Sequence, residues 1–394
     1  MVLSLFSSIK EITFKISSYC NLDCVYCFQT YESKDRNNKF YLYDELVNFM
    51  CDLPLSEEVE IKLTGGESSL FIDEIRFAYK KIKKVEKYVD TKIRFSTITN
   101  GTGIEGLIDL MDEGILSPWD CKYSWDGLYS CSRSRLPKSP LYIDEYFNNR
   151  VKILGQSKWH DDVLIRMAVT PSTVDFMYDS LLFCLDNNCH KWEYYFLTDC
   201  DDYQNPSFIK KFNQQISLIA DEYNKRPFDY YNWDTLTFTE LVLPKDNSTK
   251  LRSIGCRHLG KSLYIAQNGD IYPCGFFVPD SKYGYCQYKL GNIKEGFKKE
   301  IIKDFVVEYM KQPMCDYQYC DNFHCFECPA LTKYRTGNMN HKLCQACNLR
   351  NIERKVFHEK QQNLIDDNNM KKFISYTKEW EIQADNEKLR WTNE

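Results

Sequence analysis

The chain lacks the features that would attach it to a membrane or to nucleic acid. Its 394 residues contain no apolar run of the roughly eighteen residues that a membrane span needs. Residues 1–6 have neither the basic flank nor the cleavage site of a signal peptide. A net charge of -5 provides no basic field for DNA or anionic lipid. We therefore expect a cytoplasmic protein without nucleic-acid or membrane partners.

A disulfide framework is also not expected, although the chain has 18 cysteines, because the cytosol keeps thiols reduced. Three cysteines lie between residues 20 and 27, and nine lie between Cys256 and Cys347. Scattered cysteines are mostly small buried side chains, and here these are Cys51, Cys121, Cys131, Cys184, Cys189 and Cys200. The two clusters, by contrast, indicate metal ligands.

Up to about residue 225, strand and helix patterns alternate along a sequence that is 43% hydrophobic. The predicted strands are residues 11–16, 59–63, 92–98, 122–125, 163–169 and 191–197. The predicted helices are residues 43–53, 71–85, 104–113, 142–154, 175–187 and 207–223. These βα units predict an α/β fold with a parallel sheet and right-handed crossovers, either an open sheet or a partial barrel.

After about residue 250 the predicted strands are short and the cysteines concentrate. We therefore divide the chain into an α/β domain at 1–225, a linker at 226–250, a small cysteine-rich domain at 251–350 and a charged tail at 351–394 that we expect to be helical. The turn at Asn268-Gly269 predicts a hairpin that returns Cys274 towards Cys256.

Cys20-x3-Cys24-x2-Cys27 suits a loop folded around an iron–sulfur cluster. A [4Fe–4S] cluster normally takes four thiolates, so three would leave one iron open to another ligand. A zinc site is the alternative, but it would need a fourth protein ligand, and the nearest histidine in sequence is His160.

With Tyr26 before the last cysteine, this motif resembles that of the radical S-adenosylmethionine (SAM) enzymes. Gly65-Gly66-Glu67 resembles the family's GGE segment, which meets the amino group of SAM, although Ser68 replaces the usual proline. Ser124-Trp125-Asp126-Gly127 resembles its S-x-D-G segment, whose serine lies near the SAM carboxylate. Every fragment follows a predicted strand, where α/β barrels build their sites.

The resemblance covers about residues 10–225 and implies a partial (β/α)6 TIM-like radical SAM barrel. It makes Arg135, or failing it Arg133, the SAM-contacting arginine, and it places Asn100, Val169 and Tyr26 around SAM. The implied cofactors are a [4Fe–4S] cluster and SAM, with a reductase or flavodoxin as electron donor. The reduced cluster would cleave SAM to a 5′-deoxyadenosyl radical that abstracts hydrogen.

The later cysteines resemble the SPASM extension, which holds auxiliary [4Fe–4S] clusters in radical SAM enzymes that modify peptides. The resemblance implies a first auxiliary cluster on Cys256, Cys274 and Cys328, with Cys286 as fourth ligand or an iron open to substrate. It implies a second on Cys315, Cys320, Cys325 and Cys344, with Cys347 as the alternative to Cys344. The spacing departs from the family's between Cys315 and Cys320 and between Cys325 and Cys328, and zinc remains the alternative metal.

Among SPASM enzymes, sulfatase maturases carry an aspartate after the second cysteine of the first auxiliary cluster. This chain has Gly275 there, which disfavours that activity. We favour a maturase that installs a thioether or carbon–carbon crosslink in a ribosomally made precursor peptide. The alternatives are a radical epimerase with Cys121 or Cys200 as hydrogen donor, a small-molecule dehydrogenase, and a non-enzymatic metal-binding module with a degenerate SAM site.

We have two expectations about how the chain would bind a precursor peptide. Strand one begins close to residue 1, so we expect no preceding peptide-recognition domain, and the leader would bind the barrel, the SPASM surface or a separate recognition protein. Asp199, Asp201 and Asp202 either line a pocket for a basic peptide or form a solvated loop.

Overall fold

The computed structural model describes residues 8–29, 40–129, 135–137, 144–197, 200–225, 260–279, 281–284 and 286–309, and shorter stretches between 314 and 360. No helix within these residues has the length and apolarity required to cross a membrane. Several predictions lie outside the described residues, namely those on Arg133, Asp199, Cys256, Cys320, Cys325, Cys344, Cys347, the linker at 226–250 and the tail beyond residue 360.

Six parallel strands form the predicted α/β sheet, each neighbour pair in parallel register. In spatial order they are β1 (Ile9–Ser17), β3 (Leu55–Gly65), β4 (Lys92–Thr99), β5 (Lys122–Ser124), β7 (Leu164–Val169) and β8 (Trp192–Phe196). The fold class predicted from the sequence is therefore confirmed.

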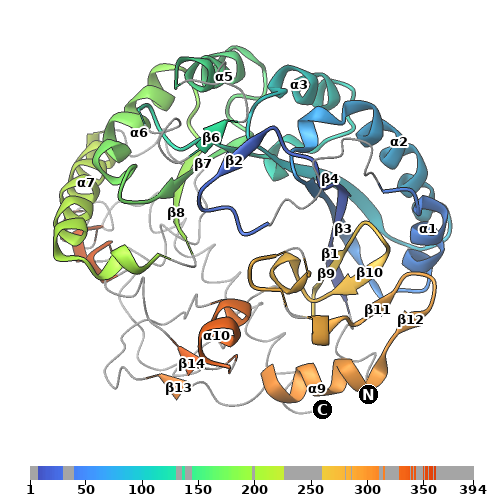
Figure 1. The fold of residues 1–394 in the computed structure, drawn as a ribbon. Coiled ribbons are helices and arrows are strands. Elements are labelled where there is room, and N and C mark those ends of the chain that lie inside the picture. Colours follow the sequence, from blue (N-terminus) through green and yellow to red (C-terminus); the bar gives the residue numbers. More distant parts are fainter. Residues whose placement is uncertain are drawn as a thin grey trace, which may run out of the picture.

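Helices connect these strands and lie in an arc around the outer face of the curved sheet (Figure 1). They are α1 (Tyr43–Cys51), α2 (Ile72–Ile82), α3 (Ile104–Asp112), α5 (Asp144–Gln156), α6 (Met177–Asp186) and α7 (Pro206–Lys225). Short 3-10 helices join them, namely η2 (Ser68–Leu70), η3 (Lys83–Lys87), η4 (Pro118–Asp120), η5 (Val174–Phe176) and η6 (Asp201–Gln204). Helices on one face of a parallel sheet that curves back on itself make a partial barrel.

The two faces of the sheet differ in polarity. On the outer face Phe14 packs its ring against Phe40 and Tyr43, with ring centroids 5.1 and 6.1 Å away. On the opposite, inner face, Lys62 Nζ lies 2.6 Å from Glu11 Oε2. Burial alone would lower the pKa of Lys62, but the nearby carboxylates, Glu11 first, outweigh burial and raise it. Alternation along each strand thus separates an apolar layer under the helices from a charged barrel interior.

The sheet continues into the carboxyl-terminal part of the chain. Strand β9 (Ser262–Ile265) pairs in parallel with β1, on the edge of β1 that β3 does not use. Antiparallel pairing then adds β10 (Asp270–Tyr272), β11 (Gly291–Asn292) and β12 (Gly296–Phe297), which gives a ten-stranded sheet from β12 to β8. The predicted hairpin at Asn268-Gly269 joins β9 to β10, with Gly269 at φ +82°.

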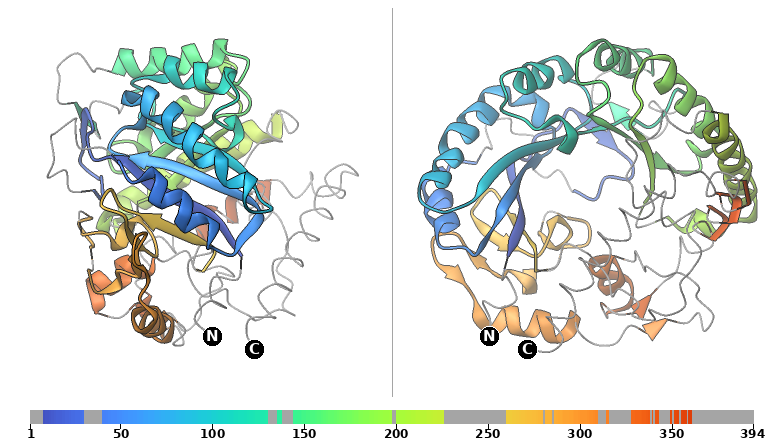
Figure 2. Two further views of the ribbon diagram at one scale, coloured as in Figure 1. Left: turned by 90° about the vertical axis from the view of Figure 1, so that its right-hand side faces the viewer. Right: turned by 180° about the vertical axis from the view of Figure 1, so that it is seen from behind.

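Two further helices, α9 (Lys299–Tyr309) and α10 (Pro329–Thr336), lie at the open side of the barrel, opposite α3 and α5 (Figures 1 and 2). The remaining short elements are η7 (Gly275–Phe277), η8 (Cys286–Tyr288), β13 (Met314–Cys315) and β14 (His341–Lys342), while β2 (Leu22–Cys24) pairs with β6 (Arg135–Pro137). A second hydrophobic cluster joins β9, η7, α9 and α10 through Tyr264, Phe277, Phe305 and Ala330.

The start of the charged tail packs on the barrel. The described residues between 349 and 360 are helical, and Leu349 and Phe357 belong to the main core. Glu353 is fully buried and accepts a hydrogen bond from the hydroxyl of Tyr194 on β8. Lys360 Nζ lies 2.5 Å from Asp221 Oδ2 on α7. The tail thus covers the outer face of the last barrel strand beside α7.

Candidate active site

The three amino-terminal cysteines lie in the segment that follows β1, and Cys24 is the last residue of β2. Cys20 is buried, whereas Cys24 and Cys27 are partly exposed. Two N–H groups point at the Cys20 sulfur, from Leu22 N at 3.4 Å and Asn100 Nδ2 at 3.9 Å. Such donors favour a thiolate, and hydrogen bonds to sulfur help to set the potential of an iron–sulfur cluster. The donor set therefore fits a cluster held by three thiolates.

Gly65 and Gly66 let the end of β3 lie directly against this cysteine loop. The amide of Gly66 donates to Ser17 O at 2.9 Å, and Glu67 N donates to Tyr19 O at 2.9 Å. A Cβ on Gly66 would lie 2.0 Å from Tyr19 O, and this distance is too short for any residue with a side chain. The pair of glycines is thus required for the backbone of the loop that carries Cys20.

The carboxylate of Glu67 is occupied by protein donors. Its Oε1 accepts from Ser69 N at 3.0 Å and from Thr99 Oγ1 at 2.6 Å, and its Oε2 accepts from Asn100 N at 2.6 Å. These bonds tie the end of β3 to the end of β4. Its side chain therefore holds the ends of the two strands together, and the predicted contact of this segment with SAM stays a prediction.

Asn100 connects the end of β4 to the cysteine loop. Its Nδ2 donates to Asn21 Oδ1 at 3.1 Å, and its Oδ1 accepts from Thr102 Oγ1 at 2.6 Å. Asn21 in turn donates to Thr102 Oγ1 at 3.1 Å. The sequence interpretation included Asn100 but missed Asn21 and Thr102. A polar residue directly after Cys20 was the available signal for Asn21, while Thr102 has none.

Asp126 and Tyr26, two predicted SAM-site residues, contact each other. Asp126 is 0% exposed, and the Tyr26 hydroxyl lies 2.9 Å from its Oδ1 and 2.7 Å from its Oδ2. Because Tyr26 lies between Cys24 and Cys27, this contact fixes the cysteine loop to the end of β5. Ser124 is the last residue of β5 and is partly exposed.

The other two predicted SAM contacts lie at the same end of the barrel. Arg135 opens β6, where its backbone pairs with that of Cys24. Val169 ends β7 and is buried, and its carbonyl accepts from Tyr203 Oη at 2.7 Å. The fold thus brings Cys20, Cys24, Cys27 and the described SAM-site residues to the carboxyl ends of the barrel strands, and their individual roles stay predictions.

The carboxyl-terminal part of the chain contacts the cysteine loop directly. Lys282 N donates to Phe28 O at 2.8 Å, and the rings of Phe28 and Phe276 have centroids 4.5 Å apart. Ser18 Oγ donates to Gln267 Oε1 at 2.6 Å. Residues that follow Cys274 therefore form one wall of the candidate active site, a contact that the sequence did not predict because these segments lie about 250 residues apart.

Of the predicted auxiliary-cluster ligands, the structure describes the side chains of Cys274 and Cys328. Both pack against the second hydrophobic cluster, which contains Tyr264 and Phe277. For Cys315 and Cys286 the backbone alone is described, in β13 and η8. The shared packing of Cys274 and Cys328 is compatible with one auxiliary cluster, and the ligand assignments stay predictions.

Gly275 lies under an aromatic ring. A Cβ at this position would be 3.0 Å from Cε2 of Tyr264 and 3.7 Å from Cε2 of Phe28. An aspartate there would require Tyr264, which is itself buried, to shift by a few tenths of an ångström. The missing acid at position 275 is therefore a feature of the packing as well as of the sequence.

Cys121 and Cys200, the two candidate hydrogen donors, differ in position. Cys121 precedes β5 and has the same strand parity as Tyr123, whose hydroxyl donates to Phe147 O on α5 at 3.0 Å. It therefore faces the helix layer, and burial raises the pKa of its thiol to about 12. Cys200 follows β8 at the candidate active-site end, and burial raises its pKa too. Cys200 is thus the better placed of the two.

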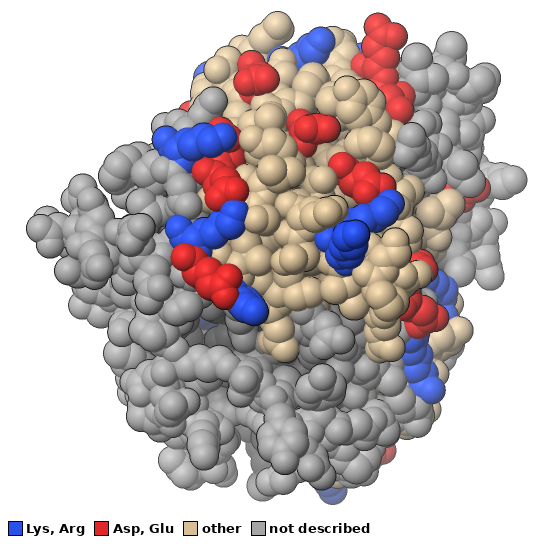
Figure 3. Space-filling view, turned by 90° about the vertical axis from the view of Figure 1, so that its left-hand side faces the viewer, with Lys and Arg blue, Asp and Glu red and all other residues tan. Residues whose placement is uncertain are grey.

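The acidic loop after β8 forms an ion pair across the molecule. Asp201 Oδ1 lies 3.0 Å from Arg335 Nη1 on α10, and Asp201 and Asp202 are both exposed. Figure 3 shows the face beside α6 and α7, where lysine and arginine alternate with acidic residues among the coloured atoms. The described part of this loop is solvated.

The comparisons with known proteins agree with this geometry. Residues 14–118 match the Radical SAM superfamily. Two relatives, cysteine-type anaerobic sulfatase-maturating enzymes from two Clostridium perfringens strains, are 26% identical to the chain over 327 and 313 residues. In each case the match covers 73% of this chain and 78% of the relative.

Solved structures share the fold. Native anSMEcpe with bound AdoMet superposes with a TM-score of 0.65 at 18% identity, covering 90% of this chain and 98% of that one. SuiB of Streptococcus suis, bound to its precursor peptide SuiA, gives a TM-score of 0.52 at 16% identity over 79% of this chain and 69% of that one. Residues 14–118 therefore match the Radical SAM superfamily, and the chain has the radical SAM α/β fold.

Proposed function

We propose that the chain is a maturase that reductively cleaves SAM and modifies a ribosomally made peptide, installing a thioether or carbon–carbon crosslink. Cys20, Cys24 and Cys27 would hold a [4Fe–4S] cluster. Such a cluster supplies one electron to SAM, whose cleavage yields an organic radical able to abstract hydrogen from carbon.

The chain's own residues would position and shield this chemistry. The network of Glu67 and Asn100 fixes the ends of β3 and β4, and the contact between Tyr26 and Asp126 fixes the cysteine loop against the end of β5. The pair Phe28 and Phe276 adds an apolar wall that would help to keep water from a reactive intermediate. A peptide substrate is further supported by the peptide-bound structures that share this fold.

The observation that favours crosslinking is the packing of Gly275 under Tyr264. In sulfatase maturases, which this site resembles, the corresponding position carries an acid that takes a substrate proton. Here there is neither an acid nor space for one without movement of Tyr264. A crosslinking reaction would also release a proton from the substrate's own nucleophile, and a group other than residue 275 would have to accept it.

Oxidation of a sulfatase cysteine is the second candidate, because the relatives at 26% identity are sulfatase-maturating enzymes. It would need another base in place of an acid at position 275. We also propose auxiliary clusters on the carboxyl-terminal cysteines, a reductase or flavodoxin as electron donor, and a leader-binding surface on this chain or on a separate protein.

The first experiment is anaerobic reconstitution with iron and sulfide, followed by dithionite and SAM. We expect 5′-deoxyadenosine, and we expect the Cys24→Ala variant to form none. Cys51→Ala is the matched control, because Cys51 ends α1 and lies in none of the proposed clusters. A wild-type chain that binds a cluster but forms no 5′-deoxyadenosine would contradict the enzyme and support a metal-binding module.

The second experiment separates the two activities by product mass. Short peptides encoded next to the gene, and a sulfatase-derived peptide containing the target cysteine, would be incubated with the active enzyme. A crosslinking enzyme would give a peptide that is lighter than its substrate by two hydrogen atoms, and it would give no peptide in which the cysteine has become an aldehyde. Conversion of the sulfatase cysteine to the aldehyde would contradict the crosslinking proposal and support the second candidate.

A further inference from the structure

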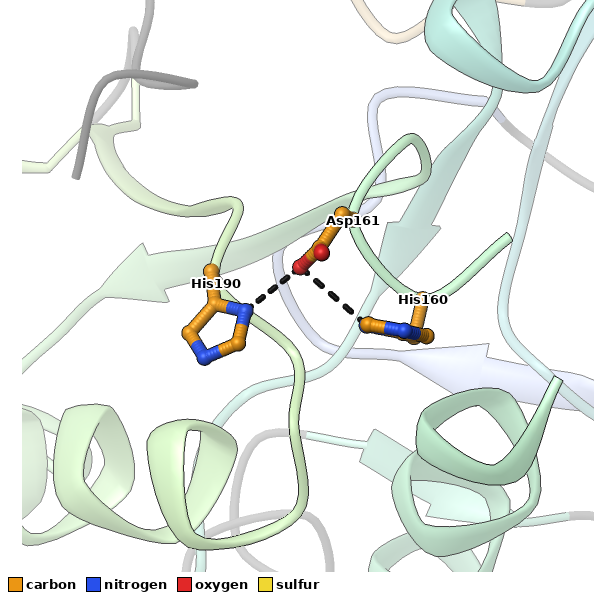
Figure 4. Close-up of side chains that lie close together, drawn as sticks. All are labelled: His160, Asp161 and His190. Atoms are coloured by element: carbon orange, nitrogen blue, oxygen red, sulfur yellow. Dashed lines mark hydrogen bonds and ion pairs between the residues drawn. The ribbon is translucent and has the colours of Figure 1, made fainter. Parts of the chain in front are cut away.

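Three side chains with metal-binding groups meet at the end of the barrel opposite the cysteine loop. His160 and Asp161 lie in the turn between α5 and β7, and His190 lies in the loop between α6 and β8. Asp161 Oδ1 is 2.5 Å from His190 Nδ1 and 3.1 Å from His160 Nδ1 (Figure 4). One ligand atom from each residue lies within 4.8 Å of the other two.

The two loops that carry this group are held together by backbone contacts. Gly155 at the end of α5 approaches Asn187 so closely that a Cβ would lie 1.8 Å from its carbonyl oxygen. Asn188 then adopts φ 61°, in the left-handed region, and the following Cys189 is fully buried. A ligand set on well-fixed loops loses little conformational entropy when a metal binds.

Asn188 also fixes the tautomer of one imidazole. Its carbonyl oxygen lies 2.7 Å from His160 Nδ1, which can donate a proton to it. With the proton on Nδ1, Nε2 is the ring nitrogen that would bind a metal, whereas the nitrogen that lies 3.1 Å from Asp161 Oδ1 is Nδ1. A backbone carbonyl that holds the second ring nitrogen of a ligating histidine is a common outer-shell feature of metal sites.

The ligand types of His160, Asp161 and His190 favour some metal ions over others. Two imidazoles and one carboxylate suit zinc and similar divalent transition metals, whereas magnesium and calcium prefer oxygen ligands. Three protein ligands leave one position of a tetrahedral site for water. The side chains are 31%, 45% and 30% exposed for His160, Asp161 and His190, so an ion can enter from solvent.

We propose that His160, Asp161 and His190 bind one divalent transition-metal ion, with zinc as the chemical type, and thereby tie the α5–β7 turn to the α6–β8 loop. This site is separate from every cysteine cluster proposed above. It would stabilise the amino ends of β7 and β8, the last two strands of the parallel series.

The test uses the full chain after its iron–sulfur clusters have been loaded, so that the thiols are occupied. Zinc is titrated against a chromogenic chelator, which gives both stoichiometry and affinity. We expect the titration to show one zinc ion whose binding depends on the histidines. Its affinity should fall by at least about tenfold in His190→Gln and in Asp161→Asn. His358→Gln, a histidine from another part of the chain, serves as the matched control and should leave the affinity unchanged.

Two readouts separate coordination from a loss of structure. X-ray absorption at the zinc edge should show nitrogen or oxygen neighbours at about 2.0–2.1 Å and no sulfur at about 2.3 Å. Zinc should also raise the thermal midpoint of the wild type and of His358→Gln but not of His160→Gln. A sulfur shell around the zinc, or a zinc affinity in His190→Gln equal to that of the wild type, would overturn the proposal.

Discussion

Gly66 has no room for a side chain, because the backbone of Tyr19 lies where its Cβ would be. We expect Gly66→Ala to push the cysteine loop away from β3 and to lower the iron bound after reconstitution by well over half. The cost to folding should exceed that of ordinary surface substitutions, at about 2 kcal/mol or more. Iron content and the urea midpoint measure the two effects.

Gly114→Ala is the control for this substitution. Gly114 has φ +68°, but a Cβ there would meet no atom within 4 Å. The alanine should cost only the backbone strain of a left-handed residue, roughly 1–2 kcal/mol, and should leave the iron content unchanged. Equal iron loss in the two variants would contradict the proposed role of the Gly66 contact.

Tyr26 tests the link between the cysteine loop and β5. Tyr26→Phe removes a hydroxyl that donates to the buried carboxylate of Asp126. We expect a loss of about 1–3 kcal/mol in the free energy of unfolding, since a buried carboxylate loses a donor. The rate of 5′-deoxyadenosine formation should fall as well, because the loop between Cys24 and Cys27 is released.

Tyr129→Phe provides the comparison, since Tyr129 is 51% exposed and its ring contact with Phe176 survives the change. It should leave the urea midpoint and the rate within error. If Tyr26→Phe behaved in the same way, Asp126 would have to be satisfied without Tyr26.

Sequence motifs identified the residues of the site better than their contacts. Cysteine spacing and the glycine pair are local signals, so Cys20, Cys24, Cys27, Gly65 and Gly66 could be read directly. Two of the three printed partners of Glu67, Thr99 and Asn100, come from the end of β4, more than thirty residues later, and no local pattern shows these contacts. Contacts that depend on the meeting of distant strands need the fold first.

Among the elements, the regular ones were predictable and the short ones were not. Each predicted barrel strand lies within a few residues of an observed strand, because alternating apolar positions such as Val59, Ile61 and Leu63 mark the buried face. Helix α2 shows the same agreement, with Ile75, Ala78 and Ile82 buried at helical spacing. Strand β9 is only four residues long, and nothing in its sequence specifies β1 as its neighbour.

Helices α9 and α10 are joined by an ion pair that should respond to pH. Lys333 Nζ on α10 lies 2.6 Å from Glu308 Oε1 on α9, and Tyr288 also donates to Glu308. Burial alone would raise the pKa of Glu308, but these partners outweigh it and lower the pKa below the ordinary 4.5. The pair therefore stabilises the fold above that pH, and its contribution is lost as the pH falls through the lowered pKa.

We expect Lys333→Met to reduce stability at neutral pH by roughly 1 kcal/mol or less, as for a partly exposed pair. The difference from the wild type should shrink as the pH drops below about 4.5. Urea midpoints measured from pH 7 to pH 3 test this. Lys303→Met, an exposed substitution on α9, should shift the midpoint little at any pH, and a gap for Lys333→Met that widens in acid would be inconsistent with the ion pair.

At the scale of the whole molecule, one sheet runs through both predicted domains. Because β9 pairs with β1, residues 262–265 extend the same sheet as the barrel strands, and Lys282 reaches the cysteine loop. The division of the chain at residues 225 and 251 stays a prediction. Cysteine density indicated where the chemistry of the chain changes, but cysteine density carries no information about strand pairing.

A fragment that ends at residue 225 would leave β1 with an unpaired edge beside the cysteine loop. Exposed edges of this kind pair with other chains. We expect the fragment to self-associate in sedimentation velocity and to lose hydrogen-exchange protection at those amides of β1 between residues 11 and 14 that face β9 in the full chain. A fragment that ends at residue 297 keeps β9 to β12 and should retain that protection. A monomeric short fragment with β1 fully protected would show that the barrel is complete without β9.

The pairing of Ile12 with Leu263 also limits how early the sheet can be completed during synthesis of the chain. A ribosome adding about 5–20 residues per second needs roughly 10–50 seconds to travel from one to the other. Throughout that interval the nascent β1 lacks one of its two neighbours, and the sheet closes only after the intervening chain has been made.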